Sequence, residues 1–388
     1  MTNTTFLQSE TDDPFVLYRK MLSTHPFYWD ERNRVWAVYS YALCHTVLND
    51  ARAVIPDVHA TAPAPLSPAA MAIVKNLARL SNAPHHATAR AVAMVAFEAL
   101  RPVAVADTLS HLLDDAGDLS ALDWVEAVAK KVPVQLLLRG FNFSPADVRV
   151  LSDTMPRLVK IMQPAKTPEQ VLALNQCAHE VYAHVEQHIL TTGLVKNILS
   201  AIPPSETLNT AEAMTMLVSN IIGLFIQSYD AGRGMLSNTL LQWLQRDTRL
   251  PAITHRDGLY RFVCETTRYA PTIHNTRRVA AEDITLNGHV IPKGETMLVV
   301  MAAANRDPLR FEHPDTFDIY RSNNDDNLTF GSGAHQCLAK HFMRRLVTET
   351  LVSLFDRYKN IALHTTRVTF EPLVNARIPA HLIIALKP

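Results

Sequence analysis

The stretch FGSGAHQCLA, residues 330–339, carries the strongest signal in this chain. Gly331 and Gly333 permit left-handed backbone angles and a close approach of other backbone that a β-carbon would obstruct. The sequence after Cys337, LAKHFMRRLVTETLVSLFDRY, predicts a helix that begins just beyond the cysteine. The amide groups and positive dipole end of that helix would stabilise a thiolate. The stretch therefore predicts an anionic cysteine on a glycine-rich loop, and the alternative is an ordinary turn before a helix with a buried cysteine.

The whole ten-residue pattern resembles the haem-binding signature of the cytochrome P450 family, Phe-x-x-Gly-x-x-x-Cys-x-Gly/Ala, with Ala339 in place of the commoner glycine. The resemblance implies that Cys337 is the axial ligand of the iron of haem b, iron protoporphyrin IX. Phe330, Gly331 and His335 are then expected to contact the cofactor.

Composition excludes several classes of protein. The 388 residues are 48% hydrophobic and 19% charged, which is enough to bury a large core. Lys plus Arg equals Asp plus Glu at 37 each, so no net field attracts the chain to nucleic acid or an anionic membrane. The four cysteines lack metal-finger spacing, and neither a signal segment nor an apolar run of about 18 residues is visible. We therefore expect a cytoplasmic protein with no membrane or nucleic-acid partner.

The fold expected from the pattern is mainly α with a small β region, in one domain over residues 1–388. Residues 209–244 read as one long buried helix, and Asn209 with Glu212 resembles a capping box. After residue 283, turns at 287–288 and 293–294 separate β-rich runs. The last residues, 367–388, predict a strand, a turn and a strand. The resemblance implies the cytochrome P450 fold, with the long helix over the haem.

A second family motif lies upstream of the cysteine. Glu265 and Arg268 are three residues apart on a predicted helix, so they share a face and can pair. They match the Glu-x-x-Arg motif of the family, and Arg321 matches the arginine that completes its buried network. The implied role is structural, because this network supports the cysteine loop.

Cationic partners for the haem propionates are also implied by the resemblance. PHHATAR places His86 and Arg90 four residues apart, as in the family helix that faces one propionate. In RRVAAED, Arg278 stands at another propionate position, and His335 is a further candidate. Surface charge is the alternative interpretation for each of them.

The predicted long helix departs from the family pattern at the positions of its acid and its threonine. Aligning FIQSYDAGRG with the family's Ala/Gly-Gly-x-Asp/Glu-Thr pattern places Asp230 at the acid and Ala231 at the threonine. Asp230 is the proposed proton relay. The missing alcohol has three explanations: a substrate hydroxyl orders the distal water, Ser228 substitutes, or the enzyme does not need protonated dioxygen. Arg233, three residues after Asp230, is expected to pair with it.

The function that these features predict is a haem-thiolate monooxygenase acting on a small organic molecule of secondary metabolism. The oxidant would be dioxygen. The electrons would come from a separate ferredoxin or flavodoxin-type protein, since no flavin or nicotinamide fingerprint is present. Gln227, His274 and Asn275 are the polar residues expected among apolar pocket walls. The first alternative is atypical chemistry by a peroxygenase, an oxidative ring-closing enzyme or a dehydratase/isomerase. The second is a non-catalytic haem-binding protein.

Overall fold

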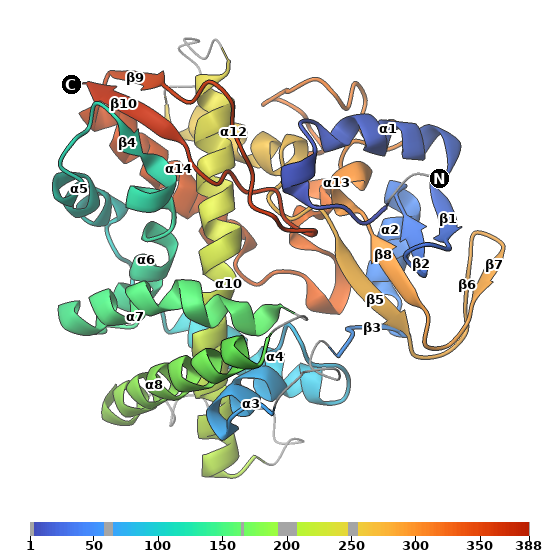
Figure 1. Ribbon diagram of the computed structural model, residues 1–388, viewed down its shortest axis with the longest axis horizontal. Coiled ribbons are helices and arrows are strands. Elements are labelled where there is room, and N and C mark those ends of the chain that lie inside the picture. Colours follow the sequence, from blue (N-terminus) through green and yellow to red (C-terminus); the bar gives the residue numbers. More distant parts are fainter. Residues whose placement is uncertain (1–3, 58–64, 164–166, 193–207, 247–254, 388) are drawn as a thin grey trace. The chain divides into compact units, whose positions relative to one another are not determined.

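A computed structural model describes residues 4–57, 65–163, 167–192, 208–246 and 255–387. Helices dominate this part of the chain and the strands are short, so the predicted mainly α fold with a small β region is confirmed (Figure 1). The α-helices are α1 (Pro14–Thr24), α2 (Tyr41–Asn49), α3 (Pro68–Asn76), α4 (His85–Glu98), α5 (Val105–Asp115), α6 (Val132–Gly140), α7 (Pro145–Leu158), α8 (Pro168–Thr192), α10 (Thr210–Leu244), α12 (Arg256–Tyr269), α13 (Met301–Ala304) and α14 (Lys340–Arg357).

The strands form three small sheets. The five-stranded sheet has the order β1-β2-β8-β5-β3, the three-stranded sheet β4-β10-β9 and the two-stranded sheet β6-β7. Their bounds are β1 (Phe27–Asp30), β2 (Val35–Val38), β3 (Ala53–Val54), β4 (Leu122–Asp123), β5 (Thr276–Ala280), β6 (Ile284–Leu286), β7 (His289–Ile291), β8 (Thr296–Val299), β9 (Asn360–Leu363) and β10 (Ile383–Lys387).

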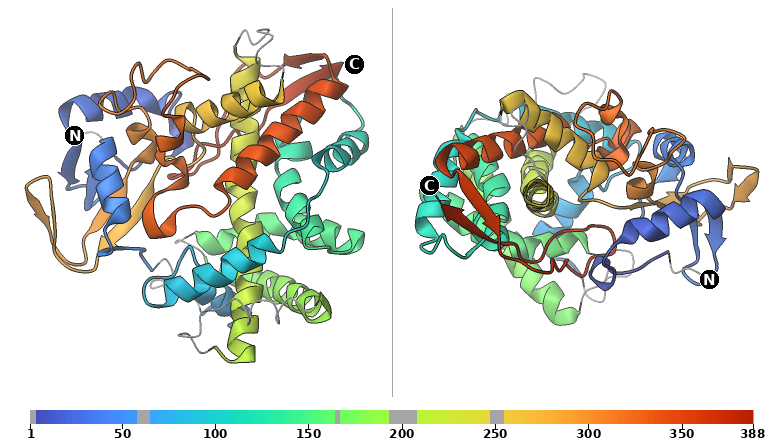
Figure 2. Two further views of the ribbon diagram at one scale, coloured as in Figure 1. Left: turned by 180° about the vertical axis from the view of Figure 1, so that it is seen from behind. Right: turned by 90° about the horizontal axis from the view of Figure 1, so that it is seen from above.

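The chain divides into two compact units that alternate along the sequence. Unit 1 comprises residues 1–54, 105–130 and 231–388, and unit 2 comprises residues 55–104 and 131–230. Unit 1 contains all three sheets together with α12 and α14, which pack side by side (Figure 2). Unit 2 is helical, from α3 and α4 through α6, α7 and α8 to the first part of α10. A single haem-thiolate domain over 1–388 stays a prediction.

Helix α10 matches the sequence-based prediction closely. It spans Thr210–Leu244, 35 residues, and its N-terminus has the predicted capping box. The Asn209 amide N–H donates to Glu212 Oε2 at 3.0 Å, and the Glu212 N–H donates to Asn209 Oδ1 at 3.0 Å. Two amide groups that the helix cannot satisfy internally are thus satisfied by side chains within one turn.

Two predicted turns of unit 1 are also confirmed. Asn287 and Gly288 connect β6 to β7 with φ of 50° and 78°, which is the left-handed pair that a tight hairpin requires. Gly294 has φ 87° and connects β7 to β8.

The predicted strand, turn and strand in residues 367–388 are found only in part, because β10 is the one regular strand among the described residues there. Residues 367–382 form only the isolated bridges Phe370↔Pro379 and Ile273↔Ala376, and β10 pairs with β4 and with β9. Pro372 and Pro379 lack the N–H groups that a continuous ladder needs. Backbone hydrogen bonds hold the segment at separate points, among them those from the Glu371 N–H to the Ile378 carbonyl and from the Ala380 N–H to the Thr369 carbonyl, both at 2.9 Å.

Candidate functional site

The cysteine loop has the backbone that its glycines predict. Gly331 and Gly333 have φ of 70° and 69°, in the left-handed region that glycine tolerates best. The Cys337 N–H donates to the carbonyl of Phe330 at 2.9 Å, which closes the loop on itself. Helix α14 then begins at Lys340, three residues beyond the cysteine. The first turn of a helix thus follows Cys337, as predicted.

Gly333 is required for a second reason, because the end of α2 lies directly against it. A β-carbon at this position would lie 2.8 Å from the carbonyl oxygen of Leu48 and 2.9 Å from Asn49 Oδ1. The Asn49 side-chain amide also donates to the Ser332 hydroxyl at 3.0 Å. The loop is therefore fixed on the C-terminal end of α2 at a place where only glycine fits.

Cys337 differs from the other three cysteines in its exposure. Cys44, Cys177 and Cys264 are buried, whereas Cys337 is exposed. Burial raises the pKa of the Cys177 thiol to about 11 and also raises the pKa values of the Cys44 and Cys264 thiols. Desolvation therefore keeps those three protonated, as expected of core thiols. The accessible sulfur of Cys337, on a glycine loop before a helix N-terminus, fits a thiolate ligand of haem iron.

The Glu265–Arg268 pair forms the predicted buried network in unit 1. Both side chains have no exposed surface, and two parallel bonds of 2.6 and 2.9 Å join them. Arg321 lies 3.8 Å from the same carboxylate and donates to the carbonyl of Glu312. The remaining Arg268 donors reach the carbonyls of Asn305, Pro314 and Thr316.

Asn305 connects this network to the cysteine loop. Its carbonyl accepts from Arg268, its side-chain amide donates to the Thr329 hydroxyl at 2.8 Å, and its Oδ1 accepts from the Leu328 N–H at 2.6 Å. Leu328 and Thr329 immediately precede Phe330. These contacts agree with the structural role predicted for Glu265 and Arg268, and they reach the cysteine loop through Asn305.

Arg278 is the buried member of an arginine pair on β5. Its neighbour Arg277 is exposed, whereas Arg278 is only 4% exposed because alternate residues of a strand face opposite sides. Arg278 Nη1 donates to the carbonyl of Arg277 and to the Thr276 hydroxyl. A guanidinium on the inward face of the strand fits the predicted propionate role, which stays a prediction.

His86 and Arg90 lie on α4 in unit 2, one turn apart on the same face. The His86 ring is buried, and its Nδ1 lies 2.9 Å from the carbonyl of Ala78, which fixes the orientation of the imidazole. Their approach to a propionate stays a prediction, as does that of His335 in unit 1.

The predicted distal residues Ser228, Asp230 and Ala231 lie within α10. The Ser228 hydroxyl donates to the carbonyl of Phe225 at 2.9 Å. Gln227 likewise donates to the carbonyl of Gly223 at 2.9 Å. These bonds satisfy backbone carbonyls of the helix itself, so they argue against Ser228 as the substitute alcohol.

Arg233 has a partner that the sequence did not indicate. Its Nη1 lies 2.8 Å from Glu371 Oε1, 138 positions away, and its side chain is 7% exposed. The predicted pairing of Arg233 with Asp230 stays a prediction. The bond to Glu371 ties α10 of unit 1 to the segment 367–382 that lacks a strand ladder.

His274 makes a contact inside the protein, and its predicted place in the wall of the substrate pocket stays a prediction. The side chain is fully buried in unit 1, and its Nδ1 lies 3.0 Å from the Tyr18 hydroxyl. Asn275 is also engaged, because its amide donates to the carbonyl of Val374 at 2.9 Å. The resemblance placed both residues in a pocket wall, and it did not indicate these contacts because the partners are distant in sequence.

The burial of His274 predicts acid sensitivity of the fold. Desolvation, with the positive charges of Arg377 and Arg306, lowers the pKa of His274 from the ordinary 6.5 to about 3. Between these values the unfolded chain binds a proton that the folded chain does not, so stability falls as the pH falls. The titration of His274 should therefore lower the free energy of unfolding by about 2 kcal/mol as the pH falls from about 6.5 to about 5. The slope is about 1.4 kcal/mol per pH unit.

The measurement compares thermal unfolding of the wild type and His274→Gln across that pH range. The amide keeps a partner for the Tyr18 hydroxyl but does not titrate, so the variant should lose less stability on acidification. Parallel pH profiles would contradict the prediction.

Helix α10 is long and apolar enough, by length and composition, to cross a membrane. However, 61% of its most apolar 18-residue window is buried inside the protein, as in the core helix of a soluble protein. The cytoplasmic location stays a prediction.

Comparison with known proteins agrees with this geometry. The sequence model of the family described as Cytochrome P450 matches residues 242–375, which include the Glu265–Arg268 pair and Cys337. The chain is 28% identical over 319 residues to the putative cytochrome P450 133B1 of Xylella fastidiosa, covering 79% of this chain and 78% of that protein. It is 26% identical over 383 residues to the biotin biosynthesis cytochrome P450 of Bacillus subtilis, covering 94% of each.

Solved structures show the same fold. CalO2 superposes with a TM-score of 0.84 at 22% identity, over 100% of both chains. CYP109E1 from Bacillus megaterium, in complex with testosterone, gives a TM-score of 0.80 at 23% identity over 97% of this chain and 100% of the other.

The fold, the cysteine loop and the Glu265–Arg268 network define a haem-thiolate enzyme. The chain is similar to the cytochrome P450 family in these motifs, in sequence and in fold. It is accordingly an oxidoreductase of the monooxygenase type, with a haem iron cofactor, a small-molecule substrate and a separate redox partner.

Proposed function

We propose that this chain binds haem b through Cys337 and uses dioxygen to oxidise a small organic molecule of secondary metabolism, with electrons from a ferredoxin or flavodoxin-type protein. The observation that carries the proposal is the cysteine loop, in which an exposed sulfur is presented by two left-handed glycines ahead of α14. The bound haem would supply the oxygen-activating chemistry.

The residues of the chain would divide the remaining work. Cys337 would hold the haem iron as a thiolate, and Phe330 and Gly331 would contact the cofactor through the loop backbone. Arg278, His335, His86 and Arg90 offer cationic or donor groups suited to carboxylates. Asp230 would serve as the proton relay on the distal side.

A second candidate function rests on Ala231. Peroxide-driven oxidation, ring closure or dehydration of a preoxidised substrate needs less proton management, and Ala231 has no hydroxyl to order a distal water. The hydrogen bond from the Ser228 hydroxyl to the carbonyl of Phe225 engages the proton of one possible substitute. This observation supports the alternative without displacing the first proposal.

Supplying the two oxidants separately distinguishes the candidates. With a surrogate ferredoxin or flavodoxin system and dioxygen, a monooxygenase forms product as it consumes reductant. A peroxygenase forms product with hydrogen peroxide alone. Product with peroxide and none with dioxygen plus reductase would select the second candidate.

Ala231→Thr tests the role of the missing alcohol in the same assay. We expect the variant to couple reductant use to product formation more tightly, because a hydroxyl at this position orders a proton donor. The ratio of product to reductant consumed is the measurement. An unchanged ratio would indicate that the proton path does not pass residue 231.

A spectral binding screen addresses the substrate class. Displacement of the distal water on binding changes the haem absorption, so occupancy is read directly. Testosterone and hexadec-9Z-enoic acid are reasonable first probes, because two similar structures are described in complex with testosterone and with an acyl carrier protein ligated to that acid. A metabolite library extends the panel.

A further inference from the structure

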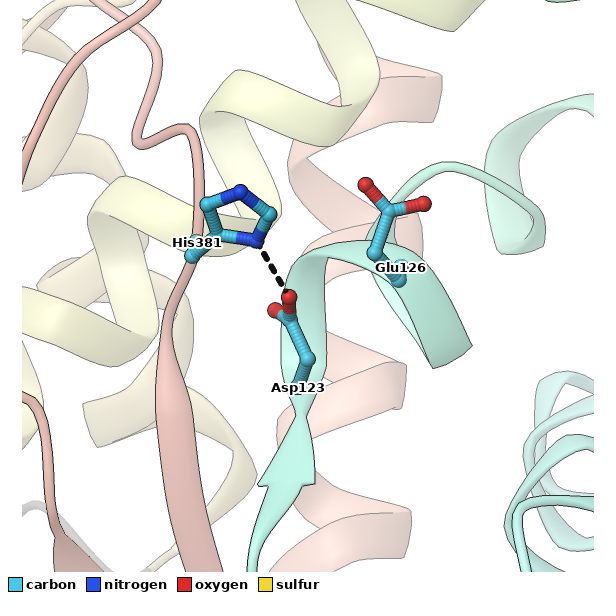
Figure 3. A group of neighbouring side chains, drawn as sticks. All are labelled: Asp123, Glu126 and His381. Atoms are coloured by element: carbon cyan, nitrogen blue, oxygen red, sulfur yellow. Dashed lines mark hydrogen bonds and ion pairs between the residues drawn. The ribbon is translucent and has the colours of Figure 1, made fainter.

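Three side chains with metal-ligating atoms converge on the surface of unit 1 (Figure 3). Asp123 ends β4, Glu126 lies in the π-helix η2 (Val125–Ala129), and His381 directly precedes Leu382 and β10. One ligating atom of each lies within 4.8 Å of those of the other two. The cluster belongs to neither the cysteine loop nor the α10 residues, and nothing in the function above uses it.

The strand register brings the three residues together. β10 pairs antiparallel with β4 so that Ile383 lies opposite Asp123, and the Trp124 N–H donates to the carbonyl of Leu382 at 2.9 Å. His381, two residues before Ile383, therefore lies beside the end of β4. Glu126 follows Asp123 by three residues, so its carboxylate approaches from the adjoining helical turn.

The backbone holds the Asp123 carboxylate in place. Its Oδ1 accepts from the amides of Val125 at 3.0 Å and Leu382 at 3.2 Å. Its Oδ2 lies 2.7 Å from the Nδ1 atom of His381. One oxygen is thus fixed by the fold, and the other is aimed at the imidazole, so the first two ligands are oriented in advance.

We propose that Asp123, Glu126 and His381 form a binding site for a borderline divalent cation, with Zn²⁺ as the ion that suits it best. One imidazole nitrogen and two carboxylate oxygens are usual zinc ligands, and a fourth position stays open to water. Two carboxylates also balance the charge of the ion. The side chains of His381 and Asp123 are 62% and 19% exposed, so the ion has access from solvent.

The geometry needs only a small adjustment. Ligands about 2.0–2.2 Å from a tetrahedral zinc lie roughly 3.4 Å from each other. The Nδ1–Oδ2 separation of 2.7 Å must therefore widen by about 0.7 Å, and Glu126 must move inward. Zinc at Nδ1 requires the imidazole proton at Nε2, on a ring that is largely exposed and can be solvated.

The three side chains also have roles that need no metal ion. Lys130 would compete with the ion for the carboxylate of Glu126. Lys130 pairs with Glu126 one helical turn away, and the two side chains are 24% and 50% exposed. Exposed pairs of this kind are weak, so a divalent ion can displace the lysine. The hydrogen bond between His381 and Asp123 alone would tie the start of β10 to β4. Zinc would strengthen this connection between residues 122–126 and the last strand.

The test is zinc titration of the purified full chain by calorimetry, in a buffer that does not bind metals and in a Cys337→Ala background that removes the exposed thiol. We expect about one ion per chain, a melting temperature that rises and saturates with zinc, and affinity at least about tenfold weaker in His381→Asn. His313→Asn is the matched control, because exposed His313 has one carboxylate neighbour, Glu312 at 3.6 Å.

Asp123→Asn could perturb the fold, because the Asp123 carboxylate also accepts hydrogen bonds from backbone amides. Glu126→Gln is therefore the second variant of the test. Glu126→Gln should weaken zinc binding, whereas Lys130→Ala should leave it equal or make it tighter. Absence of saturable binding, or equal affinity in the parent, His381→Asn and Glu126→Gln proteins, would overturn the proposal. The readouts do not involve the haem, so the result is independent of the proposed function.

Discussion

Cys337→Ala should abolish the carbon monoxide difference spectrum of a thiolate-ligated haem. Of the four cysteines, only Cys337 presents an exposed sulfur, and burial raises the pKa values of the other three thiols. Alanine leaves the loop backbone intact, because the Cys337 N–H bond to Phe330 and the glycine angles do not depend on the sulfur. The chain should therefore fold while the iron loses its anionic ligand.

The matched control is Cys177→Ala, which removes a buried thiol on α8 and should leave the difference spectrum unchanged. Cys337→Ser adds a second comparison, since a hydroxyl of similar size is a poor anionic ligand at neutral pH. Far-UV circular dichroism shows whether each variant is folded. A thiolate-type spectrum that survives in folded Cys337→Ala would refute the assignment of the ligand.

Predictions from the sequence succeeded where both partners of a contact lie within a turn. Asn209 and Glu212 are three positions apart, and Asn287 and Gly288 are adjacent, so local backbone preference alone determines their geometry. Gly331 and Gly333 belong to the same class, because their left-handed angles follow from residue type.

Contacts between distant segments were not predictable, because their register depends on the completed fold. The bond between Tyr18 and His274 spans 256 positions, and the ion pair of Arg233 with Glu371 spans 138. The sequence therefore contained no sign that His274 contacts Tyr18. The cluster around Asp123 depends on the pairing of β4 with β10, since His381 is 258 positions away. Of these long-range contacts, only the Glu265–Arg268 network could be predicted from the sequence, and it was predicted through the family motif.

Arg268→Ala should have the largest effect on stability of any substitution in the network. Arg268 makes five hydrogen bonds, and its removal leaves the carboxylate of Glu265 buried without its bidentate partner. Breaking a buried ion pair in this way costs about 3–5 kcal/mol. That is a large part of the roughly 5–15 kcal/mol that stabilises a typical protein. We expect little folded, haem-loaded protein, measured by soluble yield and the ratio of haem to protein absorbance.

Arg268→Lys is a sharper test of the geometry. Lysine keeps the charge but has one nitrogen, so it cannot bond both carboxylate oxygens of Glu265 while also reaching the carbonyls of Asn305 and Thr316. Because Asn305 anchors Leu328 and Thr329, the cysteine loop should loosen, and haem should dissociate faster in this variant than in the wild type.

The control for both substitutions lies on the same helix. Arg256 pairs with Glu349 near the start of α12, where the two side chains are 68% and 30% exposed. Arg256→Ala should change the unfolding free energy by less than about 1 kcal/mol, because exposed pairs contribute little. If Arg256→Ala and Arg268→Ala lost haem and stability equally, burial of the Glu265–Arg268 pair would not explain its importance. A large difference would show that the network stabilises the loop that presents Cys337.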